Sequence, residues 1–475
     1  MTSPVWARRN FLKNAGTSLV AIPLFSAAAE AGLNAQVTDK GKAPVKHAGA
    51  IKPKSSVRLN VKDFGAVGDG KTKDTLAVQQ ALDRCNALGG GEVLVPAGEF
   101  LTGALVIRTN TTLRLDEQAS LLGSPDLADY PLSQVRWEGK WIKGYNGYIT
   151  ATDANDIAIV GKGKIVGNTA IKGRYNRQTG IRNPALLEFT NCKNVHIEDC
   201  YTQQNDMWSI HPVYCENITF KNVIVKGNAD GIDVDSCKHV VIDGCDFATA
   251  DDCISLKSGR GSEGNTIGIP TEDVKISNCI FRDLHWACIG IGSETSGGIR
   301  NVHVDHCKCM SARTFAIYIK SRPGRGAFIE DIYMNDLEVE GAQAGFLRIN
   351  ILNSGLQDQA PVQGDDGIPT IRNFHFSNIK VKDMPMLVDG ASIHPDKPLD
   401  GFSLTNITGT CKKGIELVNM KRVVLKNISV TGYDGPLLST YNVTGTGLTG
   451  AVALPKPEPK PKDAVPALNE PYILH

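Results

Sequence analysis

The sequence lacks an excess of charge of either sign, since its 475 residues carry 51 lysines and arginines against 50 aspartates and glutamates. Proteins that bind nucleic acid or an anionic membrane surface usually show a basic field, and this balance indicates none. We therefore expect no nucleic acid and no membrane among the partners of this chain. Specificity must come from the local placement of charge.

The N-terminus also lacks an apolar run long enough to cross a membrane, because residues 15–29 fall short of the roughly 20 residues that a span needs. Arg8-Arg9-Asn10-Phe11-Leu12-Lys13 precedes this run, and small residues end it. The pattern resembles a twin-arginine export signal. We expect residues 1–35 to be that signal, removed in a periplasmic or secreted protein, residues 36–56 to be a flexible spacer, and residues 446–475 to be a Pro/Lys-rich tail.

No helical repeat competes with a recurring pattern in which one polar or turn residue precedes a short apolar, alternating run. The marker residues of this pattern are Asp156, Asn194, Asn217, His239, Asp273, Asn301, Asp331, Asn373, Gly401 and Arg422. The shortest spacings, 21 to 23 residues, with longer ones that hold insertions, are typical of a parallel β-helix. We therefore expect residues 57–445 to form one all-β solenoid domain.

A C-x-x-C pair is absent as well, so the 12 cysteines indicate no zinc site. Seven of them keep a fixed distance from the marker residues, six residues after it or two before it; these are Cys200, Cys245, Cys279, Cys307, Cys192, Cys215 and Cys237. Equivalent positions of stacked coils lie over one another, so we expect buried ladders of free thiols.

A helical pattern precedes the repeats. Asp74 is placed to cap it, and Val78, Ala81, Leu82, Cys85 and Leu88 recur along one face. We expect a short N-terminal helix that covers the open end of the solenoid, because an uncovered strand edge invites aggregation.

The most informative residues are Asp230, Asp251 and Asp252, which lie about one repeat apart. Stacked coils would bring them to one face. Asp251 and Asp252 would point to opposite faces of a regular strand, so both reach the same site only at a bend. The alternative is that these and nearby aspartates, namely Asp233, Asp235, Asp243 and Asp246, are turn residues.

Several segments, in order, resemble glycoside hydrolase family 28, the polygalacturonases. They are Asp63–Gly70, His211–Asn217, Asp230–Asp233, Asp251–Cys253, Ile291–Glu294 and Arg325–Gly326. The resemblance implies a right-handed parallel β-helix that hydrolyses α-galacturonosyl linkages of pectic polysaccharides or oligogalacturonides with inversion, without metal or cofactor. We expect a monomer.

Inverting hydrolysis needs one protonated carboxyl at the leaving oxygen and a carboxylate that holds water on the opposite face. Clustered carboxylates raise one another's pKa, so one keeps its proton. The resemblance implies that Asp251 is the general acid and that Asp230 and Asp252 position the water. The expected substrate-binding residues are Asn228, His211, Lys320, Arg322, Arg325, Arg136, Glu138, His285, Trp286, Tyr318 and Glu294.

Two positions depart from the family pattern. Trp286 or Ala287 stands where the family has the histidine of Gly-His-Gly, and Tyr318 replaces the arginine of Arg-Ile-Lys. Both changes favour a less acidic subsite and a modified or branched galacturonan. Two alternatives stay open: a pectic lyase on the same fold, which would need calcium and a basic proton abstractor, and a non-catalytic pectin-binding β-helix.

Overall fold

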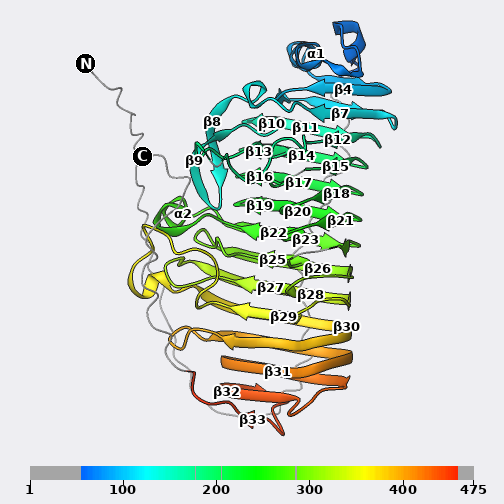
Figure 1. Ribbon diagram of the computed structural model, residues 1–475. Coiled ribbons are helices and arrows are strands. Elements are labelled where there is room, and N and C mark those ends of the chain that lie inside the picture. Colours follow the sequence, from blue (N-terminus) through cyan, green and yellow to red (C-terminus); the bar gives the residue numbers. More distant parts are fainter. Residues whose placement is uncertain (1–54, 177, 205, 284–285, 458–475) are drawn as a thin grey trace, which may run out of the picture. The chain divides into compact units, whose positions relative to one another are not determined.

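The structure is a computed structural model that describes residues 55–457 except 177, 205 and 284–285. The predicted export signal, most of the predicted spacer and the end of the predicted tail lie outside these residues. Thirty-one strands pair in parallel, coil upon coil, as one continuous sheet (Figure 1). The chain is thus a right-handed parallel β-helix, as predicted, with the hand that connections between parallel strands almost always take.

Three columns of strands form the coils, and the first carries the candidate site. We call this column the site sheet. Its strands are β5 (Leu105–Val106), β10 (Ile149–Thr152), β13 (Leu187–Thr190), β16 (Ile210–Val213), β19 (Ile232–Asp235), β22 (Ile254–Lys257), β25 (Ile289–Ile291), β27 (Phe315–Lys320) and β29 (Gly345–Asn350).

The second column carries the first seven marker residues, each near the start of its strand. It contains β1 (Arg58–Asn60), β3 (Gly91–Val95), β6 (Thr111–Leu115), β11 (Asn155–Val160), β14 (Lys193–Glu198), β17 (Glu216–Lys221), β20 (Lys238–Asp243), β23 (Thr271–Ser277), β26 (Ile299–Cys309) and β28 (Phe328–Val339).

The third column consists of short strands. They are β2 (Asp69–Lys73), β4 (Gly98–Thr102), β7 (Ala119–Gly123), β12 (Lys164–Val166), β15 (Tyr201–Gln203), β18 (Ile224–Gly227), β21 (Asp246–Thr249) and β24 (Ile280–Arg282).

Toward the C-terminus the strands lengthen and run through more than one column. They are β30 (Thr370–Ser392), β31 (Leu399–Thr431) and β32 (Leu438–Thr446). A further strand, β33 (Val452–Ala453), pairs with β32. The ladder therefore extends beyond residue 445, into the segment expected to be tail.

The marker residues mark corners of the coil. All ten have a positive φ, from 50° at Arg422 to 89° at Gly401. Asparagine and aspartate tolerate this left-handed conformation better than other residues with a side chain, which explains why they dominate the marker positions. Successive corners are also hydrogen-bonded, as where Asn217 Nδ2 donates to Asn194 Oδ1 at 3.1 Å.

The predicted cysteine ladders are present. All 12 cysteines are free and buried. The backbone N–H of Cys192 donates to the sulfur of Cys215, and that of Cys215 to the sulfur of Cys237, both at 3.3 Å. The thiols thus stack between the coils as small core residues.

The predicted helix is α1 (Thr75–Ala87), which buries Val78, Ala81, Leu82 and Cys85 against the first strands. Two details differ from the prediction. Leu88 follows the helix and is exposed. Asp74 occupies the N-cap position, but its carboxylate accepts hydrogen bonds from Val67 N and Gly68 N, and so it fixes the preceding turn.

An antiparallel hairpin, β8 (Leu132–Trp137) and β9 (Lys140–Tyr145), interrupts the repeat. Glu138 and Gly139 form its two-residue turn with φ of 43° and 78°, as a type I′ turn requires. The hairpin lies alongside β16 and β19 (Figure 1), where Trp137 stacks on Trp208 with ring centroids 4.6 Å apart. A second helix, α2 (Gly261–Ile267), follows β22. In the described part of the chain, no helix is long and apolar enough to cross a membrane.

Candidate active site

The outer face of the site sheet presents a row of polar side chains. Along each strand, apolar residues such as Ile232 and Val234 turn into the core, so the alternate residues face outward. Parallel register aligns these outward residues from coil to coil, in the order Glu188, His211, Asp233, Ser255, Gly290, Tyr318 and Arg348. Alternation and register together therefore build the floor of the candidate site.

The three aspartates meet at the edge of this floor. Asp230 lies just before β19, and Asp251 and Asp252 occupy the bend between β21 and β22. This bend is the feature that the sequence required for both side chains to share a site. The Gly231 N–H donates to the Asp252 carbonyl at 2.9 Å and links the two segments.

Asp252 is hydrogen-bonded to Lys320, to the backbone of Ala287 and to Ser255. Lys320 Nζ lies 2.6 Å from its Oδ2, and the backbone N–H of Ala287 donates to its Oδ1 at 3.1 Å. Gly290 provides the space, because a Cβ there would lie 2.4 Å from Asp252 Oδ2. Ala287, one of the two positions at which the family histidine was expected, thus contacts the carboxylate through its backbone.

Asp230 is held by Lys257, whose Nζ lies 3.2 Å from its Oδ2 and 2.5 Å from Asp233 Oδ1. The same ammonium lies 4.1 Å from the centroid of the Trp208 ring, a cation–π contact. Ser255 Oγ lies 3.3 Å from Asp230 Oδ2 and 3.2 Å from Asp252 Oδ2. Asp230 and Asp252 therefore flank a single hydroxyl.

Asp251 differs from both because its partner lies on a loop. Its Oδ2 is hydrogen-bonded to Arg174 Nη2, from the segment between β12 and β13. Burial and the nearby carboxylates of Asp230 and Asp252 raise the pKa of Asp251 to about 6, and Arg174 opposes this shift. For Asp230, burial raises the pKa, but Lys257 and Arg174 outweigh it and the pKa is lowered. The site thus pairs a carboxyl that keeps its proton near pH 5 with an ionised neighbour.

Two predicted acidic residues lie close to the cations of the site. Glu138, at the hairpin tip, is 3.3 Å from Arg260 Nη1. Burial and, as a smaller effect, repulsion from Glu294 raise the pKa of Glu138. Glu294 is buried, which raises its pKa, yet Lys257, Arg325, Arg260 and Lys320 together lower it. Cations therefore gather around Glu294.

Four predicted residues have their charged or polar groups inside the protein. Arg136 pairs with Asp235 at 3.0 Å, and both are buried. His211 lies edge-on to Trp208, 4.9 Å between ring centroids, with burial lowering its pKa. Arg322 donates to Gly355 O and Arg325 to Ser293 O. These contacts give all four a role in supporting the site from beneath or beside it.

The other predicted residues lie at the rim or on the floor. Asn228 and Trp286 are exposed, and Asn228 Nδ2 donates to Asp206 at 3.2 Å. Tyr318 lies on the floor, with Lys320 Nζ and Arg348 Cζ both 5.5 Å from its ring centroid. His285 lies outside the described residues.

Sequence reasoning missed several residues of the site, above all Arg174, Lys257 and Trp208. It also considered Asp233 and Asp235 as turn residues, whereas both lie buried within β19. The alternation of β22 was a usable signal for Lys257, because Ser255 and Lys257 must face the same side as each other. Arg174 lies in a loop without periodicity, and no pattern marks it.

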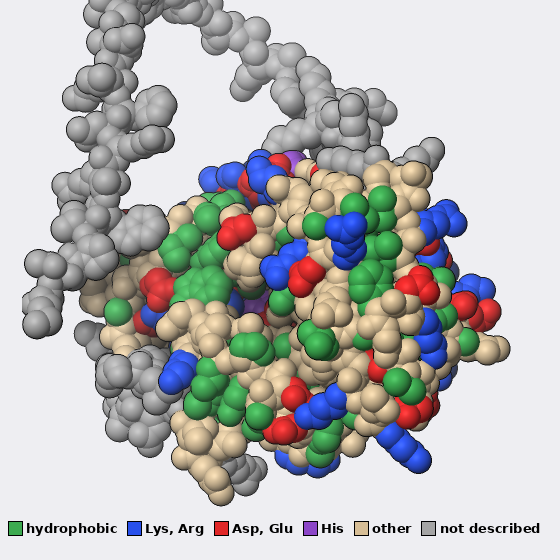
Figure 2. Space-filling view, turned by 90° about the horizontal axis from the view of Figure 1, so that it is seen from above, with side chains coloured by type: hydrophobic (Ala, Val, Ile, Leu, Met, Phe, Trp, Pro, Cys, Tyr) green, Lys and Arg blue, Asp and Glu red, His purple; other side chains and the backbone are tan. Residues whose placement is uncertain are grey.

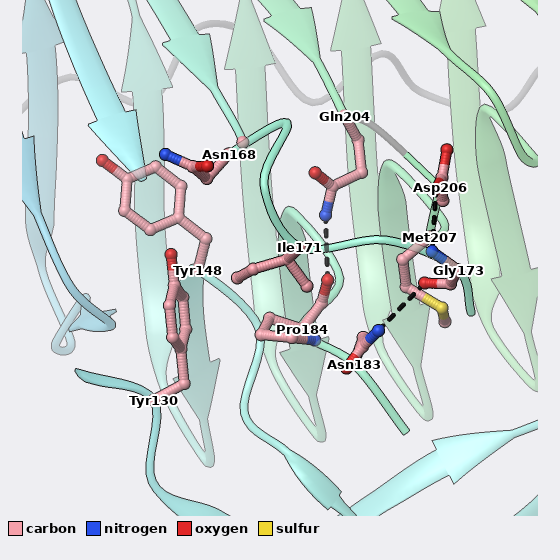
Figure 3. Close-up of a pocket in the computed structure, with 11 residues that line it drawn as sticks. Tyr130, Tyr148, Asn168, Ile171, Gly173, Asn183, Pro184, Gln204, Asp206 and Met207 are labelled. Atoms are coloured by element: carbon pink, nitrogen blue, oxygen red, sulfur yellow. Dashed lines mark hydrogen bonds between the residues drawn. The ribbon is translucent and has the colours of Figure 1, made fainter. Parts of the chain in front are cut away.

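A small recess lies at Gly173 and Met207, the residues that precede Arg174 and Trp208 in the chain (Figure 3). Its volume is about 10 Å³, room for about one water molecule, and most of its lining is uncharged; examples are Tyr130, Asn168 and Asn183. An adjoining recess of about 200 Å³ reaches Asn228 and Lys226. On the face of the molecule seen in Figure 2, basic and acidic side chains of the described residues are interspersed, so charge of one sign does not dominate there.

Comparison with known proteins places this geometry in a family. The profile of glycosyl hydrolases family 28 matches residues 85–382. A probable polygalacturonase of Vitis vinifera is 29% identical over 362 residues, 73% of each chain. An exo-poly-alpha-D-galacturonosidase of Dickeya chrysanthemi is 26% identical, covering 68% of this chain and 62% of its own.

Solved structures agree with this assignment. A hyperthermoactive exopolygalacturonase from Thermotoga maritima superimposes with a TM-score of 0.65 at 26% identity, covering 80% of this chain and 92% of its own. The chain belongs to glycosyl hydrolases family 28 and is a glycosidase of the polygalacturonase family.

Proposed function

We propose that this enzyme hydrolyses α-galacturonosyl linkages in pectic polysaccharides by a single displacement with inversion. The observation that carries the proposal is the difference in pKa between two aspartates of the trio. The pKa of Asp251 is raised to about 6, and that of Asp230 is lowered. Inverting hydrolysis needs one proton donor and one group that activates water, and this difference in pKa suits Asp251 to the first task and Asp230 to the second.

Each aspartate then has a role. Asp251, the most exposed of the three, donates its proton to the glycosidic oxygen. Asp230 and Asp252 flank Ser255 and hold the attacking water, which passes a proton to one of them as it bonds to the anomeric carbon. Because Asp251 must be protonated, activity should fall as the pH rises above about 6.

The substrate class follows from the surrounding charge. Lys257, Arg260, Lys320 and Arg325 lie close to Glu294, and lysine and arginine are the side chains suited to bind the carboxylates of a uronate chain. The relatives named above are polygalacturonases or act on poly-galacturonate by their names, which supports a pectic substrate.

We extend the proposal to modified or branched galacturonan. Tyr318 lies on the floor of the site sheet where an arginine was expected, and the recess of about 200 Å³ at Asn228 is lined mostly by uncharged groups. Such a lining would accept a substituent that carries no charge. A comparison of activity on rhamnogalacturonan fragments with activity on defined oligogalacturonides tests this extension. A preference for unsubstituted chains would contradict it.

One assay separates the proposal from its two alternatives. The wild type should release reducing ends from pectic fractions without forming unsaturated products. A chelator should not reduce this release. Asp251→Asn should lower turnover about 100- to 10,000-fold, the usual contribution of a general acid. Ultraviolet-absorbing ends that require calcium would indicate a lyase, and no release by the wild type would indicate a binding protein.

We also propose that the enzyme is exported through the twin-arginine pathway and acts as a monomer in the periplasm or outside the cell. The support is the Arg8-Arg9-Asn10-Phe11-Leu12-Lys13 segment ahead of a short apolar run. Light scattering of the mature protein tests the oligomeric state, and a mass of two chains would contradict it.

A further inference from the structure

The ion pair of Asp251 is more exposed than those of the other two aspartates. The side chains of Arg174 and Asp251 are 37% and 28% exposed. In contrast, the side chains of Asp230 and Asp252 are 8% and 3% exposed, with lysine partners at 6% and 14%. Water competes for an exposed ion pair, which therefore contributes little net stability. Arg174 can exchange its partner at small cost, whereas a buried lysine cannot.

Hydrogen bonds hold the backbone next to Arg174, at Gly173 and Asn183 (Figure 3). Gly173 N donates to Asp206 Oδ2 at 2.7 Å, and Asn183 Nδ2 donates to the Gly173 carbonyl at 3.0 Å. Asn183 N also donates to the Arg174 carbonyl at 3.1 Å. The other oxygen of Asp206 accepts from Asn228 at the rim. This network holds the base of the Arg174 side chain beside the trio.

We propose that Arg174 is a specificity-determining residue, which holds Asp251 while the cleft is empty and turns to the carboxylate of a galacturonosyl unit when substrate binds. The inference rests on the proposed role of Asp251 as the general acid. A guanidinium binds a carboxylate with two parallel hydrogen bonds, so the uronate replaces the carboxylate that Arg174 leaves. Asp251 then takes a proton from solvent and passes it to the glycosidic oxygen.

The charges around Arg174 and Asp251 explain how this movement of Arg174 changes the pKa of Asp251. Asp251 faces Asp230, Asp252, Arg174 and Lys320, and Arg174 faces Asp230, Asp251 and Glu138. After Arg174 turns away, burial and the two other carboxylates act on Asp251 with less opposition, which raises its pKa further. A methyl-esterified unit offers no charge to Arg174 and leaves the pair in place. Recognition of a free acid is thereby coupled to protonation of the catalytic group.

The test compares pH profiles of wild type and Arg174→Gln with trigalacturonate and its methyl ester as probes. The alkaline limb of kcat/KM reports the acid in the free enzyme, and that of kcat reports it in the complex. With trigalacturonate, the wild-type kcat limb should lie about one pH unit above the kcat/KM limb. In Arg174→Gln the kcat/KM limb should shift to higher pH until it coincides with the kcat limb. KM should increase about tenfold, the effect of one lost charge-assisted contact.

Further measurements separate this outcome from a structural effect. KM for the methyl ester should change little in Arg174→Gln, and Arg174→Lys should restore part of the gap between the limbs. Arg422→Gln is the matched control, because Arg422 forms an exposed ion pair with Asp400 on a distant coil; its profiles should equal those of the wild type.

Two results would overturn the inference in different ways. If Asp251→Asn is inactive but Arg174→Gln keeps both limbs and KM at wild-type values, the role of Arg174 is wrong and the proposed function stands. If Asp251→Asn retains near-normal activity, the proposed function fails, and this inference fails with it.

Discussion

At the scale of single residues, the three aspartates differ through their partners. Lys257 and Lys320 approach Asp230 and Asp252 from the floor of the site sheet, while Arg174 reaches Asp251 from a loop. The aspartates are alike in chemistry, so the identity and exposure of each cation must determine which of them gives up a proton. This is how one residue type can supply both an acid and a water-positioning group.

Gly290 offers a sharp test of how closely Asp252 must be placed. Its φ is outside the left-handed region, so Gly290→Ala adds only a methyl, and that methyl would lie 2.4 Å from Asp252 Oδ2. Displacement of the carboxylate by about 1 Å should lower kcat about 100-fold. Steady-state kinetics measures this, with urea unfolding to check the fold; near-normal kcat in a folded variant would show that Asp252 need not occupy this position.

At the scale of elements, the regular parts of the fold could be predicted from the sequence and the insertions could not. Residues such as Asn194 and Asn217 were recognisable as coil corners because few residues with a side chain tolerate a positive φ there. The aspartate trio could be placed because coils stack in register. Both inferences rely on a constraint that recurs in every coil.

The hairpin β8–β9 and the Arg174 loop obey no such recurring constraint. The hairpin had one readable signal, its Glu138-Gly139 turn between two apolar-alternating runs. The pairing of Arg136 with Asp235 joins residues 99 positions apart in sequence, and no local pattern encodes such a contact. Long-range ion pairs therefore had to be observed in three dimensions.

The buried pair of Arg136 and Asp235 should anchor the hairpin. Arg136→Met would leave a buried carboxylate without its cation, which costs about 3 to 5 kcal/mol of unfolding free energy. Urea unfolding at pH 7 would measure the loss. Arg108→Met is the control, because Arg108 and Asp83 form an exposed pair whose loss should cost at most about 1 kcal/mol. Equal effects of the two substitutions would contradict the anchoring role.

The pH dependence of this effect has a defined sign. Burial raises the pKa of Asp235, but Arg136 and His211 outweigh it and the pKa is lowered. The pair's contribution is thus present above the unfolded pKa of about 3.9 and is lost as the pH falls through the folded pKa. Without Arg136, burial would raise the pKa instead. The deficit of Arg136→Met should therefore be largest near pH 7 and shrink toward pH 4.

At the scale of the whole molecule, stacking of coils separates stability from chemistry. The inward residues form one continuous core, while the outward row of the site sheet and the inserted loops carry the candidate chemistry. A solenoid tolerates insertions between coils because each coil contacts mainly its neighbours. Changes of substrate can therefore arise in loops such as that of Arg174 without disturbing the fold.

Export is also a property of the whole molecule. Replacing both Arg8 and Arg9 by lysine should keep the precursor in the cytoplasm, because the twin-arginine signal is read as an address and not as charge. Cell fractionation and immunoblotting would measure this. Undiminished export of the double variant would show that another pathway recognises the N-terminus.

The stereochemistry of the first product tests the central claim most directly. Proton NMR can follow the anomer released from an α-linked galacturonate oligomer before mutarotation mixes the two forms. If Asp251 protonates the leaving oxygen while Asp230 and Asp252 direct water to the opposite face, the β anomer must appear first. Initial appearance of the α anomer would contradict a single displacement by the aspartate trio.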